Sequence, residues 1–406
     1  MVLAAFEIGT CDERSESMKS AACLSQEPDL AAAVEEVCGA VREQLSESSP
    51  DLSFLFVSHD HSAGFDELAD LVQSKIESRV LLGCAGETIV GGGEEIESGP
   101  AISLWSAVLP GTDLEEFQLE FARTPDGIIC EGFPPGLEDE ATDVRAVFVL
   151  GEPFSSVPDS VIERLAVDLP GTPLIGGMAS GGTGPGQNRL FLNSEVIEQG
   201  AVGVILRGGG AIRSVVSQGC RPIGRSFVVT AADENFVMQL GGRPAMEQLR
   251  SLVPDLSDRD QRLLQKGLHL GIVMNEFQES FSRGDFLIAN VIGARSEDDA
   301  LAIGGRVRVG QTVQFHVRDA QTAHEDLAEL LDADREAHPA RAQAGLLFSC
   351  NGRGTRLFPE PNHDAGVIQQ QCGPIPLAGF FAQGELGPVG ETNHVHGFTA
   401  SVALFE

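Results

Sequence analysis

Apolar positions along the chain follow two spacings, and together these predict alternating strands and helices. Nearly continuous apolar runs are typical of buried strands, and they occupy 52–58, 101–109, 146–153, 172–178 and 346–350. Other segments carry apolar residues three and four positions apart, which predicts helices at 28–45, 65–78, 161–169, 323–337 and around 365–371. Asp29 is a candidate N-cap of the first helix. Strands that alternate with helices indicate an α/β fold.

One order of elements recurs: a strand, a helix, a strand that ends in glycine, and a hairpin. LLGCAGE (81–87) matches LIGGMASG (174–181), which indicates an internal repeat of roughly 60 residues. The C-terminal stretch repeats this order, beginning with LLFSCNGRG (346–354). We therefore predict four related units, two in each half of the chain. The terminal hairpins make the sheets mixed rather than purely parallel.

With 406 residues, the chain is long enough for two domains that each bury a core. Residues 1–27 are rich in serine and acidic residues and are expected to form a loosely ordered lead-in. A first layered domain is placed at 28–222 and a second at 223–406. Within the second domain, the pattern at 234–253 predicts a helix.

The balance of charge excludes several partners. The chain carries 60 acidic and 27 basic residues, a formal net charge of −33. Such a field repels nucleic acids and anionic membrane surfaces, so neither is expected to bind. No apolar run reaches roughly 18 residues, and the N-terminus lacks the pattern of a secretory signal. We therefore expect an acidic cytoplasmic protein without membrane insertion.

Cysteine and histidine patterns predict neither a metal nor a cofactor. Eight cysteines stand singly and form no C-x-x-C pair, so neither a structural zinc site nor a disulfide framework is indicated. The pairs His59/His61 and His394/His396 each share one face of an extended segment, but no further ligand can be named for either.

Four glycine loops each follow a predicted strand, where ligands bind in many α/β folds. Exposed amides at such turns can hold a carboxylate or phosphate. None of the loops matches G-x-G-x-x-G or the phosphate-loop pattern, so a nucleotide site is not favoured. The same glycines can instead serve tight turns between close-packed strands. The candidate ligand-binding residues from these loops are Cys84, Gly86, Glu87, Gly177, Ser180, Gly181, Cys350, Gly352, Gly354 and Gly384.

Arg353 lies between two glycines in CNGRG. Its guanidinium suits a ligand carboxylate, but in so acidic a chain it could equally pair internally with Glu385. Arg221 in QGCRPIG could likewise bind a ligand carboxylate or form an internal ion pair. Both alternatives are open for both arginines.

Cys350 is a weak candidate for a catalytic nucleophile. A cysteine near an arginine can have a lowered pKa, and His396 could serve as its base. Against this, a free cysteine usually behaves as a small buried hydrophobe. Whether the chain is an enzyme is therefore left open, with a non-catalytic role favoured.

Five segments, taken together, resemble the FIST family: QGCRPIG, GDFLIANVIG, FSCNGRG, GFFAQGELGP and HGFTASVAL. The resemblance covers residues 28 to 406 and implies a FIST N domain followed by a FIST C domain. The chain resembles the stand-alone bacterial members of the family, since no F-box, kinase or cyclase segment precedes residue 28. Through these motifs it adds Cys220, Arg221, Asn290, Arg353 and Glu385 to the candidate ligand-binding residues.

The resemblance implies an intracellular sensory module for signal transduction. We expect a small ligand, an amino acid or a related carboxylate metabolite, in a cleft lined by the glycine loops. A downstream signalling protein would read the bound state. The alternatives are an enzyme with Cys350 as nucleophile and a non-catalytic scaffold protein.

Overall fold

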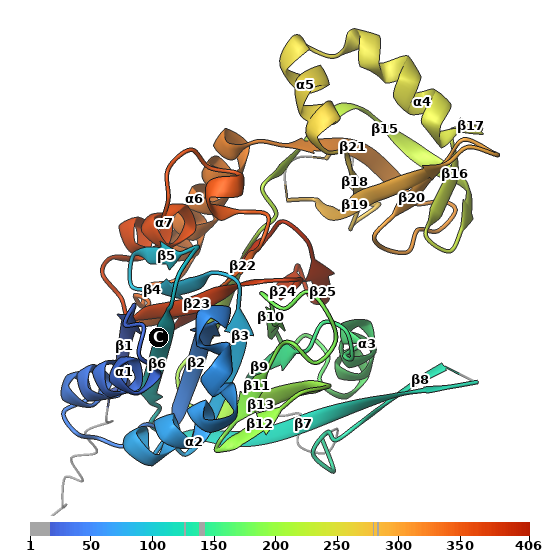
Figure 1. Cartoon of the computed structure of the whole chain (residues 1–406). Helices are drawn as coiled ribbons and strands as arrows, with labels where there is room; N and C mark the ends of the chain where they lie inside the picture. Colours follow the sequence, from blue (N-terminus) through green and yellow to red (C-terminus); the bar gives the residue numbers. More distant parts are fainter. Residues whose placement is uncertain (1–16, 126, 138–142, 279, 282–283) are drawn as a thin grey trace, which may run out of the picture.

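The computed structural model of the chain describes residues 17–125, 127–137, 143–278, 280–281 and 284–406 (Figure 1). Three α/β units share one body, and an antiparallel barrel stands apart from it at the top of the view. The predicted α/β class, with mixed sheets and repeated units, is confirmed. The repeated units number three rather than four, because the strands of the barrel follow a different order.

Each unit contains an edge strand, two parallel strands joined by a helix, and a last strand antiparallel to the first of these two. The first unit consists of β1 (Lys19–Ser25), α1 (Leu30–Gln44), β2 (Leu52–Ser58), α2 (Phe65–Ile76), β3 (Val80–Gly86) and β6 (Ile102–Val108). The second consists of β7 (Thr112–Thr124), β8 (Gly127–Glu131), β9 (Val144–Gly151), α3 (Pro158–Asp168), β10 (Leu174–Met178) and β13 (Ala201–Gly208). The third consists of β14 (Ile212–Ser217), α6 (Ala320–Ala337), β22 (Ala344–Cys350), α7 (His363–Cys372), β23 (Leu377–Ala382) and β26 (Ala400–Phe405).

A short hairpin leaves each unit and completes the sheet of another unit. The hairpins are β4 (Ile89–Gly91) with β5 (Glu94–Ile96), β11 (Leu190–Leu192) with β12 (Glu195–Ile197), and β24 (Glu385–Val389) with β25 (Thr392–His396). Strand β4 pairs with β23, β11 with β3, and β24 with β10. The exchange is therefore cyclic: each unit donates one hairpin and receives one.

A glycine at the same place in each unit lets the two parallel strands approach closely. The motif is Leu-x-Gly, ending at Gly83, Gly176 and Gly379. A Cβ atom at these positions would lie 2.3, 2.0 and 1.9 Å from a carbonyl oxygen of the neighbouring strand, closer than any real contact. The sequence match between LLGCAGE and LIGGMASG thus reflects a steric requirement that recurs a third time in β23.

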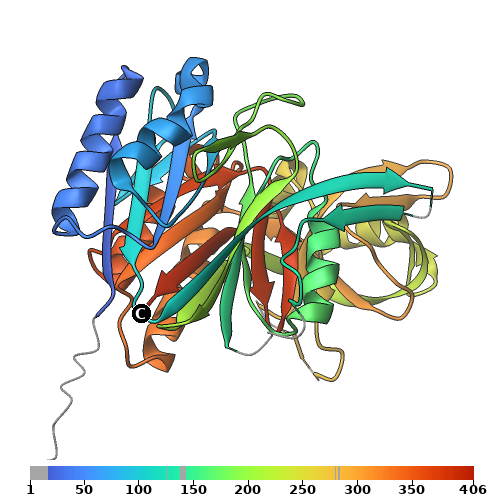
Figure 2. The same ribbon diagram turned by 90° about the horizontal axis from the view of Figure 1, so that it is seen from below.

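The inner faces of the three sheets share one core. Trp105 of β6 packs on Phe405 of β26, with ring centroids 4.9 Å apart, and Phe405 stacks on Phe148 of β9 at 5.9 Å. One aromatic ring from each unit therefore meets in the centre. Helices α1 and α2 lie on the outer side of the first sheet, as the view from below shows (Figure 2).

The barrel is inserted between β14 and α6 of the third unit. Its strands are β15 (Cys220–Asp233), β16 (Phe236–Leu240), β18 (His269–Val273), β19 (Phe286–Arg295), β20 (Ala300–Ile303) and β21 (Thr312–Arg318). Strand β15 pairs with both β21 and β16, which closes the sheet on itself. The short β17 (Arg243–Pro244) and the helices α4 (Ala245–Leu252) and α5 (Asp258–Lys266) complete this part, and both helices pack their apolar residues on the barrel core.

Two segments differ from the sequence-based expectation. Strand β1 lies inside 1–27, where loose order was expected; it pairs with β6 through all seven of its residues. The prediction of a helix over 234–253 is wrong for the first half of this segment. Gly241 and Gly242, both with positive φ, form a turn there after β16. The division of the chain into domains at 222/223 stays a prediction.

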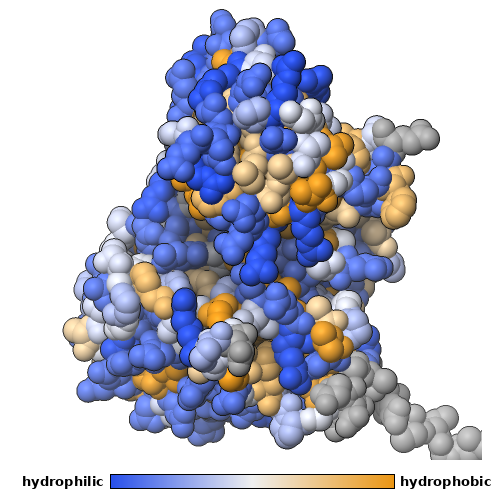
Figure 3. Space-filling model, turned by 90° about the vertical axis from the view of Figure 1, so that its right-hand side faces the viewer, coloured by the Kyte–Doolittle hydropathy of each residue, from blue (hydrophilic) through white to orange (hydrophobic). Residues whose placement is uncertain are grey.

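The face of the molecule in Figure 3 is mainly hydrophilic, with apolar residues in separate patches among the polar ones. None of the helices in the described ranges combines the length and the apolarity that a bilayer-spanning helix needs.

Replacing Gly379 by alanine should lower the free energy of unfolding by about 1–3 kcal/mol, because its Cβ would collide with the Leu347 carbonyl in a packed sheet. The matched control is Gly39→Ala in α1, where nothing lies within 4 Å and removal of a helical glycine should stabilise by about 0.5–1 kcal/mol. Urea denaturation of both variants checks this. Equal stability of the two variants would contradict the close-approach argument.

Candidate functional site

The barrel joins the main body through two short connections, residues 218–219 and Asp319. The first connection is held by Asp326 of α6, whose Oδ2 accepts hydrogen bonds from Ser217 Oγ (2.7 Å) and from the Gly219 amide (3.0 Å). The side chain of Gln218 donates to the Phe286 carbonyl (2.7 Å) and accepts from the Ile288 amide (2.9 Å). These bonds fix the angle at which the chain enters the barrel.

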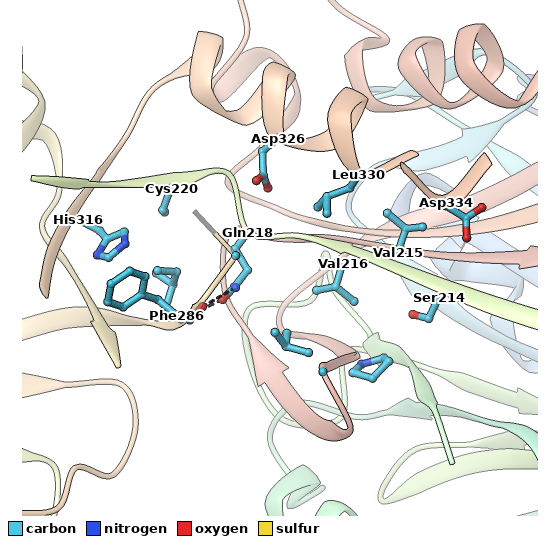
Figure 4. Close-up of a pocket in the computed structure, with 15 residues that line it drawn as sticks. Ser214, Val215, Val216, Gln218, Cys220, Phe286, His316, Asp326, Leu330 and Asp334 are labelled. Atoms are coloured by element: carbon cyan, nitrogen blue, oxygen red, sulfur yellow. Dashed lines mark hydrogen bonds between the residues drawn. The ribbon is translucent and has the colours of Figure 1, made fainter. Parts of the chain in front are cut away.

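A pocket of about 310 Å³ lies beside this connection (Figure 4). We call it the hinge slot, and residues of both the barrel and the main body line it. Figure 4 shows the lining side chains spread along an elongated space, from His316 and Phe286 at the barrel end to Ser214 and Asp334 at the other. The lining residues are Ser214, Val215, Val216, Gln218, Cys220, Gly284, Phe286, Ile288, His316, Asp326, Leu330, Asp334, Pro388, Val389 and Gly390.

Polar and apolar groups line the hinge slot in similar measure. Its carboxylates belong to Asp326 and Asp334, both on α6 and both at least nine-tenths buried. Burial lowers the pKa of His316 to about 4, so this imidazole is neutral at physiological pH. Ser214 Oγ is buried and has no hydrogen-bond partner in the described part of the chain. Small-molecule sites combine apolar walls with placed polar groups, and the hinge slot offers both.

A second polar cluster lies where β21 of the barrel meets the ends of β22 and β24. Glu385 is fully buried; its Oε2 accepts from the Thr399 amide (3.0 Å), while its Oε1 makes no hydrogen bond to a described residue. Burial raises the pKa of Glu385 to about 8, so the carboxyl is largely protonated at neutral pH. Burial and the neighbouring Glu385 raise the pKa of the Cys350 thiol to about 12.

Arg318 connects this cluster to the barrel. Its guanidinium lies 3.8 Å from the ring centroid of Phe398 and donates to the Gly352 carbonyl (3.1 Å). Its Nη1 is buried and without a hydrogen-bond partner among the described residues. Phe398 has a φ of +67°, a region that residues other than glycine rarely adopt, so the backbone here is constrained. Burial lowers the pKa of Arg318, but the group remains charged.

The ion-pair partner of Arg353 within the fold is Asp364 of α7 rather than Glu385. Both side chains are fully buried, and the pair is bidentate: Nε to Oδ2 at 2.6 Å and Nη2 to Oδ1 at 2.8 Å. Burial alone would raise the pKa of Asp364, but the Arg353 guanidinium and then His363 hold it well below its usual range. The Arg353 guanidinium therefore neutralises a buried carboxylate inside the fold.

Arg221, the second arginine candidate, is likewise occupied. It forms ion pairs with Asp260 of α5 and with Asp319 at the second connection. Cys220 lines the hinge slot and pairs in register with Arg318. Asn290 lies on β19, where its side chain bonds His269 Nδ1 at 3.0 Å, and it faces Gly397 of the main body.

The remaining sequence candidates meet elsewhere, where the three exchanged hairpins cross. Ser180 Oγ donates to the Phe381 carbonyl and accepts from the Glu87 amide (2.8 Å), which joins the ends of β3, β10 and β23. A Cβ on Gly177 would lie 2.8 Å from that of Ala382, so space there is tight. The other residues at this junction are Cys84, Gly86, Gly181, Gly354 and Gly384.

The structure therefore divides the sequence candidates into two groups. Cys350, Gly352 and Glu385 come together beside the barrel, close to Cys220 and Asn290, whereas the glycines after β3 and β10 pack the sheet junction. Sequence reasoning missed Asp326, Gln218 and Arg318. Gln218 stood within the quoted QGCRPIG motif, but an aspartate in an amphipathic helix, such as Asp326, carries no local signal.

Cys350 and His396 are not brought together as a nucleophile and base. His396 Nε2 bonds the Gly387 carbonyl (3.0 Å), and no hydrogen bond joins this residue to Cys350 among the described residues. Burial lowers the pKa of His396 to about 4. The described residues also contain no group of three or more His, Cys, Asp or Glu arranged to hold a metal ion.

Replacing Arg353 by methionine should lower the free energy of unfolding by about 3–5 kcal/mol, because Asp364 would be left as an unpaired buried charge. The double variant Arg353→Met/Asp364→Leu should recover much of this loss. Arg356→Met is the matched control, since Arg356 pairs with Glu87 at the surface and its loss should cost about 1 kcal/mol or less. A small effect of Arg353→Met in chemical denaturation would contradict the assignment.

The raised pKa of Glu385 makes stability depend on pH. The native state keeps this proton up to about pH 8, whereas the unfolded chain loses it near pH 4.5. The free energy of unfolding should therefore fall as pH rises through this window, by up to about 1.4 kcal/mol per pH unit. Glu385→Gln should remove this contribution and leave that of Glu95, whose pKa is also about 8. The exposed Glu336→Gln serves as control; identical pH slopes for the two variants would refute the prediction.

Comparison with protein-family models matches a FIST N domain to residues 51–243 and a FIST C domain to residues 245–388. Two mycobacterial proteins are similar over nearly their whole length. "Uncharacterized protein Rv0628c" of Mycobacterium tuberculosis is 42% identical over 382 residues, covering 94% of this chain and 98% of the relative. "Uncharacterized protein Mb0898c" of Mycobacterium bovis is 41% identical over 378 residues, covering 93% and 96%. The chain thus belongs to the FIST family, whose domains generally serve in sensing and signal transduction.

Proposed function

We propose that this protein is a sensory module that binds a small ligand, an amino acid or a related metabolite, in the hinge slot. The observation that carries the proposal is the double role of Asp326. Its carboxylate lines the slot and also holds the connection between the main body and the barrel. A ligand bound there changes the bonds that set the position of the barrel.

The chemistry of the slot supports a ligand of amino-acid type. Its volume of about 310 Å³ lies at the lower end of the range for small-molecule sites. Asp326 uses Oδ2 for its hydrogen bonds to Ser217 and Gly219, which leaves Oδ1 to accept from a ligand ammonium group. Val216, Phe286 and Ile288 offer apolar surface to a side chain.

The ligand carboxylate requires donors other than the two arginines favoured by the sequence. Arg353 and Arg221 both have carboxylate partners within the fold. Donors that remain in the slot include the Ser214 hydroxyl and the backbone amides of β14. Backbone amides that lack an internal partner bind carboxylates in many proteins.

A signal follows if the ligand competes for Asp326. An ammonium group at Oδ1 draws the carboxylate toward the slot and weakens its bonds to Ser217 and Gly219. The barrel then changes its position relative to the α/β body, and a downstream signalling protein reads the change. The ligand shifts this equilibrium only by its difference in affinity for the two positions.

A thermal-shift screen of amino acids and related metabolites tests the proposal. A ligand present at 100 times its Kd should stabilise the protein by about 2.7 kcal/mol and raise its Tm. Asp326→Asn keeps acceptors for Ser217 and Gly219 but removes the charge, so it should weaken binding about 10- to 100-fold. Asp332→Asn changes the charge equally at a half-buried position of the same helix that pairs with Arg335 and does not line the slot, so this control should bind normally. The proposal fails if no metabolite raises the Tm of folded protein, or if Asp326→Asn binds as tightly as wild type.

A further inference from the structure

Strand β14 is the last strand of its sheet, and no described strand pairs with its outer edge. Among the strands of the described ranges, β26 is its one partner, in the register Ile212 to Phe405 through Ser217 to Ala400. The amide of Glu406 donates to the Ala211 carbonyl, which fixes which residues of β14 face β26. By the alternation of an antiparallel ladder, the N–H and C=O groups of Ser214 and Val216 point away from β26. No described residue forms a hydrogen bond with these four groups.

The free edge forms one side of the hinge slot. Ser214 and Val216 both line the slot, as do Leu330 of α6 and Val389 at the turn of the β24–β25 hairpin. The helix lies against the face of β14 that carries Val215, while Val216 packs toward Gly387 of the hairpin. The slot is therefore a groove along a strand edge, walled on both sides (Figure 4).

The wall formed by α6 is acidic at both ends and apolar in the middle. Asp326, Leu330 and Asp334 follow one another at intervals of four residues, so they share one face of the helix. The two carboxylates are separated by eight residues, about 12 Å along the helix axis. Arg213 pairs with Asp334, and the buried Arg353 acts electrostatically on Asp326 from the main body, but the residues that line the slot include no lysine or arginine. A cationic side chain on the ligand therefore fits this wall, and the net charge of −33 adds to the attraction.

We propose that the hinge slot binds a short extended peptide, which pairs with β14 as an additional strand and directs a basic side chain toward α6. This inference rests on the proposed function, because it assigns the ligand of the same slot. Ser214 and Val216 present their backbone groups about 7 Å apart, the repeat of an extended chain. A peptide can match both residues with its amides, whereas a free amino acid has no amide and reaches only one. Pairing of this kind supplies affinity through the backbone and selectivity through alternate side chains.

The test uses the full chain and three capped tripeptides in isothermal titration calorimetry. Acetyl-Val-Lys-Val-amide should bind. Acetyl-Val-Glu-Val-amide should bind at least tenfold more weakly, because its carboxylate faces Asp326 and Asp334. The lysine peptide with N-methylated backbone amides should also lose at least tenfold, because it can no longer donate to the carbonyls of β14. A lysine peptide whose N-methylated form binds equally well would overturn the pairing with β14.

Two variants with the same change in charge locate the site. Leu330→Lys puts a cation in the acidic wall. Because Leu330 is 37% exposed, the fold should persist. The lysine peptide should lose at least tenfold in affinity for this variant. Glu336→Gln changes the charge equally at an exposed position of the same helix and should bind the peptide normally. Equal peptide binding by both variants would overturn the assignment to this slot.

The outcomes separate this inference from the proposed function. If a free amino acid binds and is lost in Leu330→Lys, but none of the peptides binds, the peptide inference is wrong and the proposed function stands. If neither free metabolites nor peptides bind to folded protein, both are wrong. Binding of the lysine peptide that depends on its amides and on Leu330 supports both.

Discussion

The cyclic exchange of hairpins among three sheets is the constraint on which the rest of the structure depends. Each sheet obtains two strands from another unit, so the junction where the hairpins cross must be tightly packed. Gly177 meets that demand, because a Cβ there would collide with Ala382, whereas the Leu-x-Gly glycines allow the close pairing of the two parallel strands within each unit. The exchange also brings β24 to the end of β10, which places Glu385 opposite Gly177. The buried cluster beside the barrel thus depends on the same junction.

The sequence alone predicts the elements whose pattern is local. Helices α1, α2 and α6 have clear apolar periodicity, and the side chain of Asp29 caps α1 as expected, with a 2.9 Å bond to the Ala32 amide. The repeated order of elements also indicates the α/β class. The partners of the three-residue strands are not predictable in this way, because the pattern of a strand this short does not specify which distant strand it joins. The barrel was missed for a related reason: its closure depends on β15 pairing with two strands far apart in the chain.

The candidate site was predictable only in part. Motifs in the last sixty residues pointed to Cys350, Gly352 and Glu385, which do lie together near the barrel. The pairing of Arg353 with Asp364 was not predicted, although both residues belong to the same unit, since a buried partner eleven positions away leaves no local signature. Asp326 and the free edge of β14 depend on tertiary structure alone. An unpaired edge is a property of the whole sheet, and no residue type marks it.

The exchange of hairpins also determines when the chain can fold during its synthesis. Ile89 leaves the ribosome early, but its partner in the sheet is Phe380, close to the C-terminus. At translation rates of about 5–20 residues per second, the first hairpin waits about 15–60 s for its strand. The first unit likewise lacks β11 and β12 until the second unit has been made. The three units should therefore mature together after release of the chain, and a truncated chain should expose unpaired strand edges that invite aggregation.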